Sequence, residues 1–235
     1  MRLGRYVDTV NMRGAQRNRR PRPPSGPPGK AAGARRPYHH GDLRRALLAT
    51  AARLLETDGP AALSLREVAR ATGVSQTAPY RHFADKEALL AALAADGFAE
   101  LARRMTEAEA GVDAPVERLR ALGRGYVDFA LAHPHVFRLM FGPEIPDRRA
   151  HPPLFAAATA AQEKLGAAIA ACRRGLSRDA ADERTALVAA WSLVHGLATL
   201  LIGDQFRETD VTARAALVDG VTRLFARMLA ERPAF

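Results

Sequence analysis

Between residues 73 and 86 the chain carries side chains suited to hydrogen bonding with nucleic-acid bases and phosphates. The Gln76 amide could pair with adenine, and the Arg81 guanidinium could bind N7 and O6 of a guanine. Thr77 could contact a thymine methyl group or another base edge. Phosphate oxygens are the partners expected for the other polar side chains: Tyr80, His82, Lys86 and, earlier in the chain, Ser64. These residue types predict contact with DNA.

Such contacts need a rigid frame, and the flanking residues predict one. Ser64 could use its hydroxyl as a helix N-cap instead of a phosphate ligand, with Glu67 reaching back to the Ser64 amide. Gly73 readily takes the positive φ that ends a helix, and Ser75 is expected to cap a second helix over 76–83. Two short helices joined by a tight turn form a helix-turn-helix, whose second helix enters the DNA major groove.

Most of the remaining chain shows the apolar spacing that is typical of amphipathic helices. The predicted helices lie over 42–57, 85–109, 116–132, 154–174, 179–206 and 209–230, with a short apolar segment ending at 141. We therefore expect an all-α fold of about nine helices. A three-helix DNA-binding domain at 38–84 precedes a helical bundle at 85–235, which is larger than DNA binding requires and is expected to bind a ligand and dimerise.

The positive charge is concentrated in the N-terminal segment. The chain has a formal net charge of +10, but nine arginines and Lys30 lie before residue 38 against the single acid Asp8. Residues 1–37 are also rich in proline and glycine, so we predict a disordered tail. It would either add nonspecific attraction to phosphates or be no more than a solvated or over-extended start. The high charge alone is therefore a poor argument for DNA binding.

The sequence lacks the residue patterns of catalysis and of metal binding. Cys172 is the only cysteine, which excludes an intrachain disulfide and a cysteine-based zinc site and fits a reducing cytoplasm. His133 and His135 are two residues apart and would face different sides of a helix. No nucleophile–base pair and no phosphate-binding glycine loop is recognisable. We expect no enzyme activity, no metal and no cofactor.

The most apolar segment, 186–202, is shorter than the 20 or so residues that a membrane span needs. Small residues recur along it at alternating spacings of three and four, where a second helix could approach closely: Ala189, Ser192, Gly196, Thr199 and Gly203. The last helix offers an apolar face that includes Val221, Leu224 and Phe225. We predict that these two helices pair with the same two helices of a second chain and form a four-helix dimer interface. Packing of the helices within one chain is the alternative.

Trp191 and His195 are four residues apart and share one helix face. Together they could line a ligand pocket. A histidine that is hydrogen-bonded within the core is the alternative for His195.

The segment 38–90 contains Leu-Arg-Glu-Val-Ala-Arg-Ala-Thr-Gly-Val-Ser at 65–75, Tyr-Arg-His-Phe at 80–83 and Asp-Lys-Glu-Ala-Leu-Leu at 85–90. With these motifs it resembles the TetR family of one-component transcriptional repressors. In that family a Tyr-x-His-Phe and a lysine three residues later stand where Tyr80, His82, Phe83 and Lys86 stand. Pro79 departs from the family's usual leucine.

One branch of the family is similar at Ala-Pro-Tyr-Arg-His-Phe, at 130–141 and at Trp-Ser-Leu-Val-His-Gly, residues 191–196. The resemblance implies a homodimer on a palindromic operator and a helical domain whose ligand shifts the DNA-binding domains apart. The function expected is that of a cytoplasmic, ligand-responsive repressor. The alternative is an architectural DNA-binding protein without a small-molecule ligand, for which the basic tail would matter most.

Overall fold

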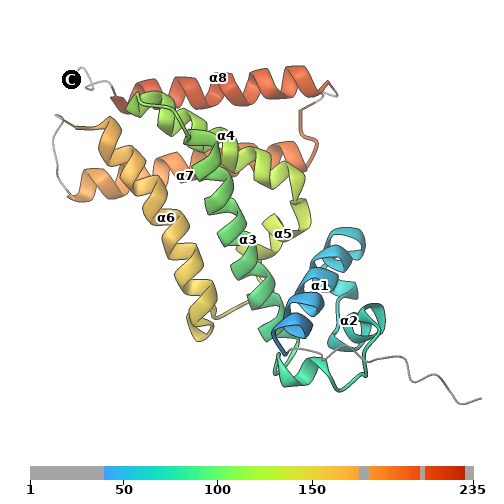
Figure 1. Ribbon diagram of the computed structural model, residues 1–235. Helices are drawn as coiled ribbons and strands as arrows, with labels where there is room; N and C mark the ends of the chain where they lie inside the picture. Colours follow the sequence, from blue (N-terminus) through green and yellow to red (C-terminus); the bar gives the residue numbers. More distant parts are fainter. Residues whose placement is uncertain (1–39, 175–179, 207–209, 231–235) are drawn as a thin grey trace, which may run out of the picture. The chain divides into compact units, whose positions relative to one another are not determined.

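The computed structural model describes residues 40–174, 180–206 and 210–230, and all regular secondary structure in them is helical (Figure 1). The α-helices are α1 (His40–Ala62), α2 (Leu65–Thr72), α3 (Lys86–Glu109), α4 (Pro115–Ala132), α5 (Pro134–Phe141), α6 (Pro152–Cys172), α7 (Ala180–Ile202) and α8 (Val211–Ala230). Two 3-10 helices, η1 (Pro79–Arg81) and η2 (Arg148–Ala150), complete the order. The all-α prediction is confirmed, and the predicted tail 1–37 lies outside the described residues.

Helix α1 is interrupted where the sequence predicts that it ends. Gly59 has φ of 74°, and Pro60 begins one further turn that reaches Ala62. Leu47, Ala51 and Leu55 are fully buried on one face of the helix. Glycine tolerates this left-handed conformation because it has no Cβ atom.

The segment predicted as a helix over 76–83 is shorter in the structure, because Pro79 has no N–H to donate to the Ser75 carbonyl. The Ala78 amide donates to that carbonyl instead, at 3.0 Å, and closes a turn. The 3-10 helix η1 then begins at Pro79. The described residues therefore contain eight α-helices. The 3-10 helix η1 stands where the sequence predicts a ninth helix, over 76–83.

Helix α3 connects the DNA-binding segment to the rest of the chain. Its N-cap is Asp85, whose Oδ1 accepts a hydrogen bond from the Ala88 amide at 2.8 Å. The helix packs against α4, α5 and α6. A Cβ atom at Gly97 would lie only 2.7 Å from Val136 Cγ1, so this glycine permits the close approach of α3 to α5.

Helix α7 contains a stretch, Asp182–Ile202, that is long and apolar enough to cross a membrane by length and composition. Helices in protein cores pass the same test. The helix packs against α4, α6 and α8. Its buried side chains are Ala186, Ala190, Val194, Leu197, Ala198 and Leu201.

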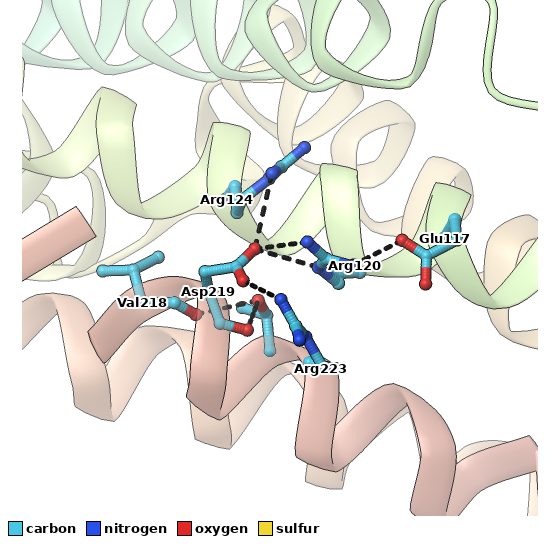
Figure 2. A network of polar contacts seen from close by, with 7 residues as sticks. Glu117, Arg120, Arg124, Val218, Asp219 and Arg223 are labelled. Atoms are coloured by element: carbon cyan, nitrogen blue, oxygen red, sulfur yellow. Dashed lines mark hydrogen bonds and ion pairs between the residues drawn. The ribbon is translucent and has the colours of Figure 1, made fainter. Parts of the chain in front are cut away.

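Asp219 joins α8 to α4, and three arginines converge on its carboxylate (Figure 2). Oδ1 accepts hydrogen bonds from Arg120 at 2.6 and 3.0 Å, and Arg124 Nη1 lies 3.4 Å from the same oxygen. Arg223, one turn further along α8, pairs with Oδ2. Glu117 Oε2 accepts from Arg120 at 2.6 Å and holds that side chain from the opposite side. This network fixes the lateral position of α8 on α4.

Candidate nucleic-acid interface and ligand cavity

The N-terminus of α2 is capped as the sequence predicts. Ser64 Oγ accepts a hydrogen bond from the Glu67 amide at 3.1 Å, and Gly73 ends the helix with φ of 77°. The reciprocal half of the capping box is absent, because the Glu67 carboxylate pairs with Arg70 instead. The Ser64 hydroxyl therefore serves the helix cap, and its phosphate contact remains a prediction.

The segment after Gly73 is anchored by apolar side chains and directs its polar ones outwards. Pro79 and Phe83 are buried, and the Arg44 guanidinium lies 5.4 Å from the centre of the Phe83 ring. The Phe83 amide donates to the Pro79 carbonyl at 3.0 Å, which keeps the turn compact. Four of the predicted DNA contacts are exposed on this turn: Gln76, Thr77, Tyr80 and Arg81.

Lys86 and His82 differ in their accessibility. Lys86 is exposed, and its Nζ donates to the Pro60 carbonyl at 2.8 Å. An ammonium group has three donors, so this bond leaves two for a phosphate. His82 is half-buried, and its Nε2 is enclosed without a hydrogen-bond partner among the described residues. A phosphate contact by His82 would have to use the other ring nitrogen.

Helices α3, α4, α6 and α7 and the segment around η2 line a partly open cavity of about 340 Å³. Most of its lining is apolar or aromatic: Phe98, Leu101, Met105, Tyr126, Phe141, Leu154, Phe155, Ala158, Ala161, Leu165, Leu187 and Trp191. Thr159, Gln162 and two arginines, Arg148 and Arg149, supply the remaining polar groups. An apolar cavity with a few polar groups is the usual form of a small-molecule site.

The structure separates the two residues that the sequence predicts as pocket lining. Trp191 forms part of the cavity wall, whereas His195 does not line this cavity and bonds to Tyr126, a wall residue. The Tyr126 hydroxyl lies 2.9 Å from His195 Nδ1 and accepts a hydrogen bond from Trp191 Nε1 at 3.3 Å. The His195 ring also packs edge-on against Phe141, with ring centres 4.6 Å apart.

Burial determines the protonation of this hydrogen-bonded pair. It raises the pKa of Tyr126 and lowers the pKa of His195, so both side chains are neutral at physiological pH. The direction of the hydrogen bond between the Tyr126 hydroxyl and His195 Nδ1 follows the tautomer of the neutral imidazole. His195 is half-buried, bonds to Tyr126 in the wall of this cavity and lines a separate cavity together with Phe137 and Thr199, so its contact with a ligand remains a prediction.

The sequence analysis does not identify the residues of α6 that line the cavity, nor the two arginines, as site residues. Arg148 and Arg149 lie in a loop rich in proline and glycine, with no helical periodicity to indicate which way they face. Only their proximity to Phe155 and Trp191 in the folded chain shows that they border a cavity. No group of three or more potential metal ligands occurs among the residues that the structure describes.

The small-residue face predicted on α7 is largely exposed on the single chain. Ala189, Ser192, Thr199 and Gly203 are exposed, and Gly196 is half-buried. On α8, Leu224 is 65% exposed, whereas Val221 and Phe225 are half-buried. Large apolar side chains are exposed beside them on the same two helices: Val188, Leu200 and Met228. The dimer interface remains a prediction.

A helix-turn-helix with exposed polar residues, joined through α3 to a helical domain that contains an apolar cavity, defines a class: DNA-binding transcriptional regulators with a ligand-binding domain. Residues 47–93 match the family model described as bacterial regulatory proteins, tetR family. Residues 119–229 match the tetracyclin repressor-like, C-terminal domain. The chain belongs to the TetR family.

Individual relatives are similar to the chain over most of its length. The chain is 27% identical over 208 residues to the HTH-type transcriptional regulator Rv1816 of Mycobacterium tuberculosis, a match that covers 76% of this chain and 88% of that protein. A solved protein of unknown function from Rhodococcus sp. RHA1 is 36% identical, with a TM-score of 0.71 over 83% of this chain and 99% of that one. The fold is also that of the TetR family regulator PfmR from Thermus thermophilus, at 22% identity and a TM-score of 0.58, over 77% of this chain and 97% of PfmR.

Proposed function

We propose that the protein is a ligand-responsive transcriptional repressor that binds an inverted-repeat operator as a homodimer and is released by a small-molecule effector. One observation carries the proposal: α3 packs against the DNA-binding segment and also lines the cavity. Leu89 and Leu90, at its start, are buried in the cluster that also contains Leu47 and Phe83 of the DNA-binding segment. Further along the same helix, Phe98, Leu101 and Met105 line the cavity.

A ligand that reorders the cavity wall would therefore act on the helix that supports the DNA-binding residues. It can shift the protein between two conformations only by its differential affinity for them. A second polar link supports the same coupling, because the Glu56 carboxylate of α1 accepts hydrogen bonds from the His135 and Val136 amides, at 3.3 and 3.2 Å, at the start of α5. Phe141, at the end of α5, lines the cavity.

Homodimerisation is proposed from the exposed apolar side chains of α7 and α8 together with the small residues of α7. A single helix-turn-helix reads one half-site, and a dimer places two recognition elements about 34–36 Å apart. The motifs at 78–83 and 191–196 support the family branch that the sequence suggests. We expect the protein to act in the cytoplasm, where its DNA target lies.

Footprinting of the full-length protein on the DNA upstream of its own gene tests the proposal. The expected result is protection of two symmetric half-sites one helical turn apart. Absence of protection, or protection of one unpaired half-site, would contradict it.

The second candidate, an architectural DNA-binding protein without a ligand, is favoured by the concentration of positive charge before residue 38. Removal of residues 1–37 discriminates between the two. The repressor should retain selective operator binding, with a smaller salt dependence, whereas the architectural protein should lose DNA binding altogether.

A further inference from the structure

We propose that the effector is an apolar carboxylic acid, with its apolar body in the cavity of α3, α4, α6 and α7 and its carboxylate on Arg148 and Arg149. This inference rests on the proposed function and names the class of ligand that the cavity takes. It follows from the composition of the cavity wall, from the position of the two arginines and from the absence of opposing charge among the described lining residues.

The apolar wall of the cavity indicates that most of the ligand is apolar. Side chains of α3 and α6, including Phe98, Leu101, Met105, Leu154 and Leu165, present hydrocarbon surface to the cavity. A volume of about 340 Å³ corresponds to roughly ten water molecules. Such a space suits one medium-length acyl chain or a compact ring system. Burial of that apolar surface would supply most of the binding free energy.

The two arginines at the border of the cavity indicate the polar group of the ligand. Arg148 is half-buried, and its Nη2 donates one long hydrogen bond, 3.5 Å, to the Gly142 carbonyl. The Arg149 guanidinium lies 6.0 Å from the centre of the Phe155 ring, a residue that also lines the cavity. The nearby Asp147 carboxylate accepts from the Arg149 backbone amide at 3.0 Å, as the cap of η2.

Neither guanidinium forms an ion pair with a carboxylate in the described part of the chain, although Arg103, Arg118 and Arg120 do so elsewhere in the same domain. The planar guanidinium fork matches the two oxygens of a carboxylate. Arg148 and Arg149 therefore keep most of their hydrogen-bond donors available at the border of an apolar space.

The charge of the lining residues indicates the sign of the ligand's charge. Among the described residues, the cavity is lined by two arginines and by no aspartate or glutamate. A cationic ligand would meet like charges close to a low-dielectric wall, where charge interactions are stronger than in water. Tyr126, Thr159, Gln162 and Trp191 offer only uncharged polar groups. The wall thus complements a negative head group on an apolar body.

Calorimetric titration of the full-length protein with decanoate and with decanamide tests the inference, because the two probes share one shape and differ in charge. We expect decanoate to bind about tenfold more tightly than decanamide, a difference of about 1.4 kcal/mol. In the Arg148→Gln, Arg149→Gln double variant, decanoate should bind as weakly as decanamide, and the affinity for decanamide should be unchanged. That unchanged affinity also shows that the variant is folded.

Arg138→Gln is the matched control. This arginine is exposed on α5 and its substitution removes the same charge, but it does not line the cavity, so the variant should keep the full preference for decanoate. Equal binding of the two probes by the unaltered protein would overturn the inference, as would a preference that persists in the double variant. Tighter binding of decyl phosphate than of decanoate would overturn the choice of a carboxylate.

An operator-binding measurement separates this inference from the proposed function. If the protein protects a symmetric operator but fails to bind decanoate selectively, the repressor proposal stands and the carboxylate inference is wrong. If decanoate binds selectively but no DNA is protected, the repressor proposal is wrong and the ligand class stands.

Discussion

The Nε2 atom of His151 lies 3.0 Å from Glu87 Oε1, and this contact joins two segments that are 64 residues apart in the sequence. Glu87 is in the first turn of α3, four residues after the buried Phe83. His151 follows η2, which carries Arg148 and Arg149, and is the N-cap residue of α6. The contact therefore connects the border of the cavity to the helix that follows the DNA-binding turn.

We expect this contact to transmit ligand binding to the DNA-binding residues. His151→Ala should reduce the effect of decanoate on operator affinity by about fivefold, equivalent to about 1 kcal/mol of coupling free energy. Operator affinity without decanoate and the affinity for decanoate itself should change little. Fluorescence anisotropy of a labelled operator, with and without decanoate, measures all three quantities.

A double-mutant cycle with Glu87→Gln provides the control. If the two side chains act through their mutual contact, each single variant and the double variant lose the same coupling. Losses that simply add would show that the residues act independently, and the proposed route would be wrong.

Arg81 and Lys86 should affect DNA binding in different ways. Arg81→Ala is expected to relax the preference for one base pair by about 1–3 kcal/mol, because the exposed guanidinium is assigned to a guanine edge. Lys86→Ala should weaken binding to all sequences alike and lower the salt slope by about one. Titration of operator and scrambled DNA at several salt concentrations measures both effects. Equal loss of specificity in the two variants would refute the assignment.

Gly196 should be required for dimerisation rather than for folding. A Cβ atom at this position would meet no atom of the described residues within 4 Å beyond its chain neighbours and the backbone of its own helix, so packing among the described residues does not explain the glycine. Gly196→Leu should leave the helical circular dichroism unchanged and weaken the dimer by at least about tenfold, since the added side chain obstructs a close helix–helix approach. Sedimentation equilibrium measures the dissociation constant. Gly166→Leu on α6, where added atoms also meet open space, is the control and should dimerise normally.

Local signals in the sequence predict the DNA-binding segment well, and long-range packing determines what they miss. Ser64 and Gly73 mark helix ends through bonds to residues within five positions, and both act as predicted. The helix predicted over 76–83 is wrong in length because Pro79 withholds a single hydrogen bond.

The cavity depends on contacts between distant segments. Arg148 and Arg149 border it because α6, which directly follows η2, packs against α3, and no periodic pattern in their loop indicates this. Trp191 and His195 share one helix face, yet the position of Tyr126, some 65 residues earlier, decides that one lines the cavity and the other does not. Sequence spacing predicts which residues share a face but not what the opposite helix supplies.

Asp219 should make the stability of the protein depend on pH. Hydrogen bonds from Arg120 lower the pKa of this carboxyl below its ordinary value of 3.8; partial burial opposes the shift, and Arg223 adds to it. A carboxylate whose pKa is lowered by folding stabilises the protein above its ordinary pKa, and the contribution disappears as the pH falls through the lowered value. Asp219→Asn should therefore cost about 1 kcal/mol of unfolding free energy at neutral pH.

The cost should vanish when the pH falls below the lowered pKa, where Asp219 is itself protonated. Urea denaturation at fixed protein concentration, at pH 7 and over a series of values below 4, measures the difference. Asp113→Asn, at an exposed position between α3 and α4, is the control and should cost little at any pH. A cost that stays constant down to the lowest pH would contradict the electrostatic origin of the effect.

Trp191 should report occupation of the cavity, because it is the only tryptophan in the chain and lines the cavity wall. It is 39% exposed, and its Nε1 donates to the Tyr126 hydroxyl. An apolar ligand that displaces water from the cavity should shift the indole emission to shorter wavelength. Titration with decanoate should give a shift that saturates with the calorimetric dissociation constant.

Tyr126→Phe is the control for this fluorescence signal, because it removes the hydrogen-bond acceptor of the indole but keeps the ring in the cavity wall. The starting emission of the variant should change, while the shift induced by decanoate should persist. Emission that does not respond to a ligand shown by calorimetry to bind would place that ligand outside the cavity.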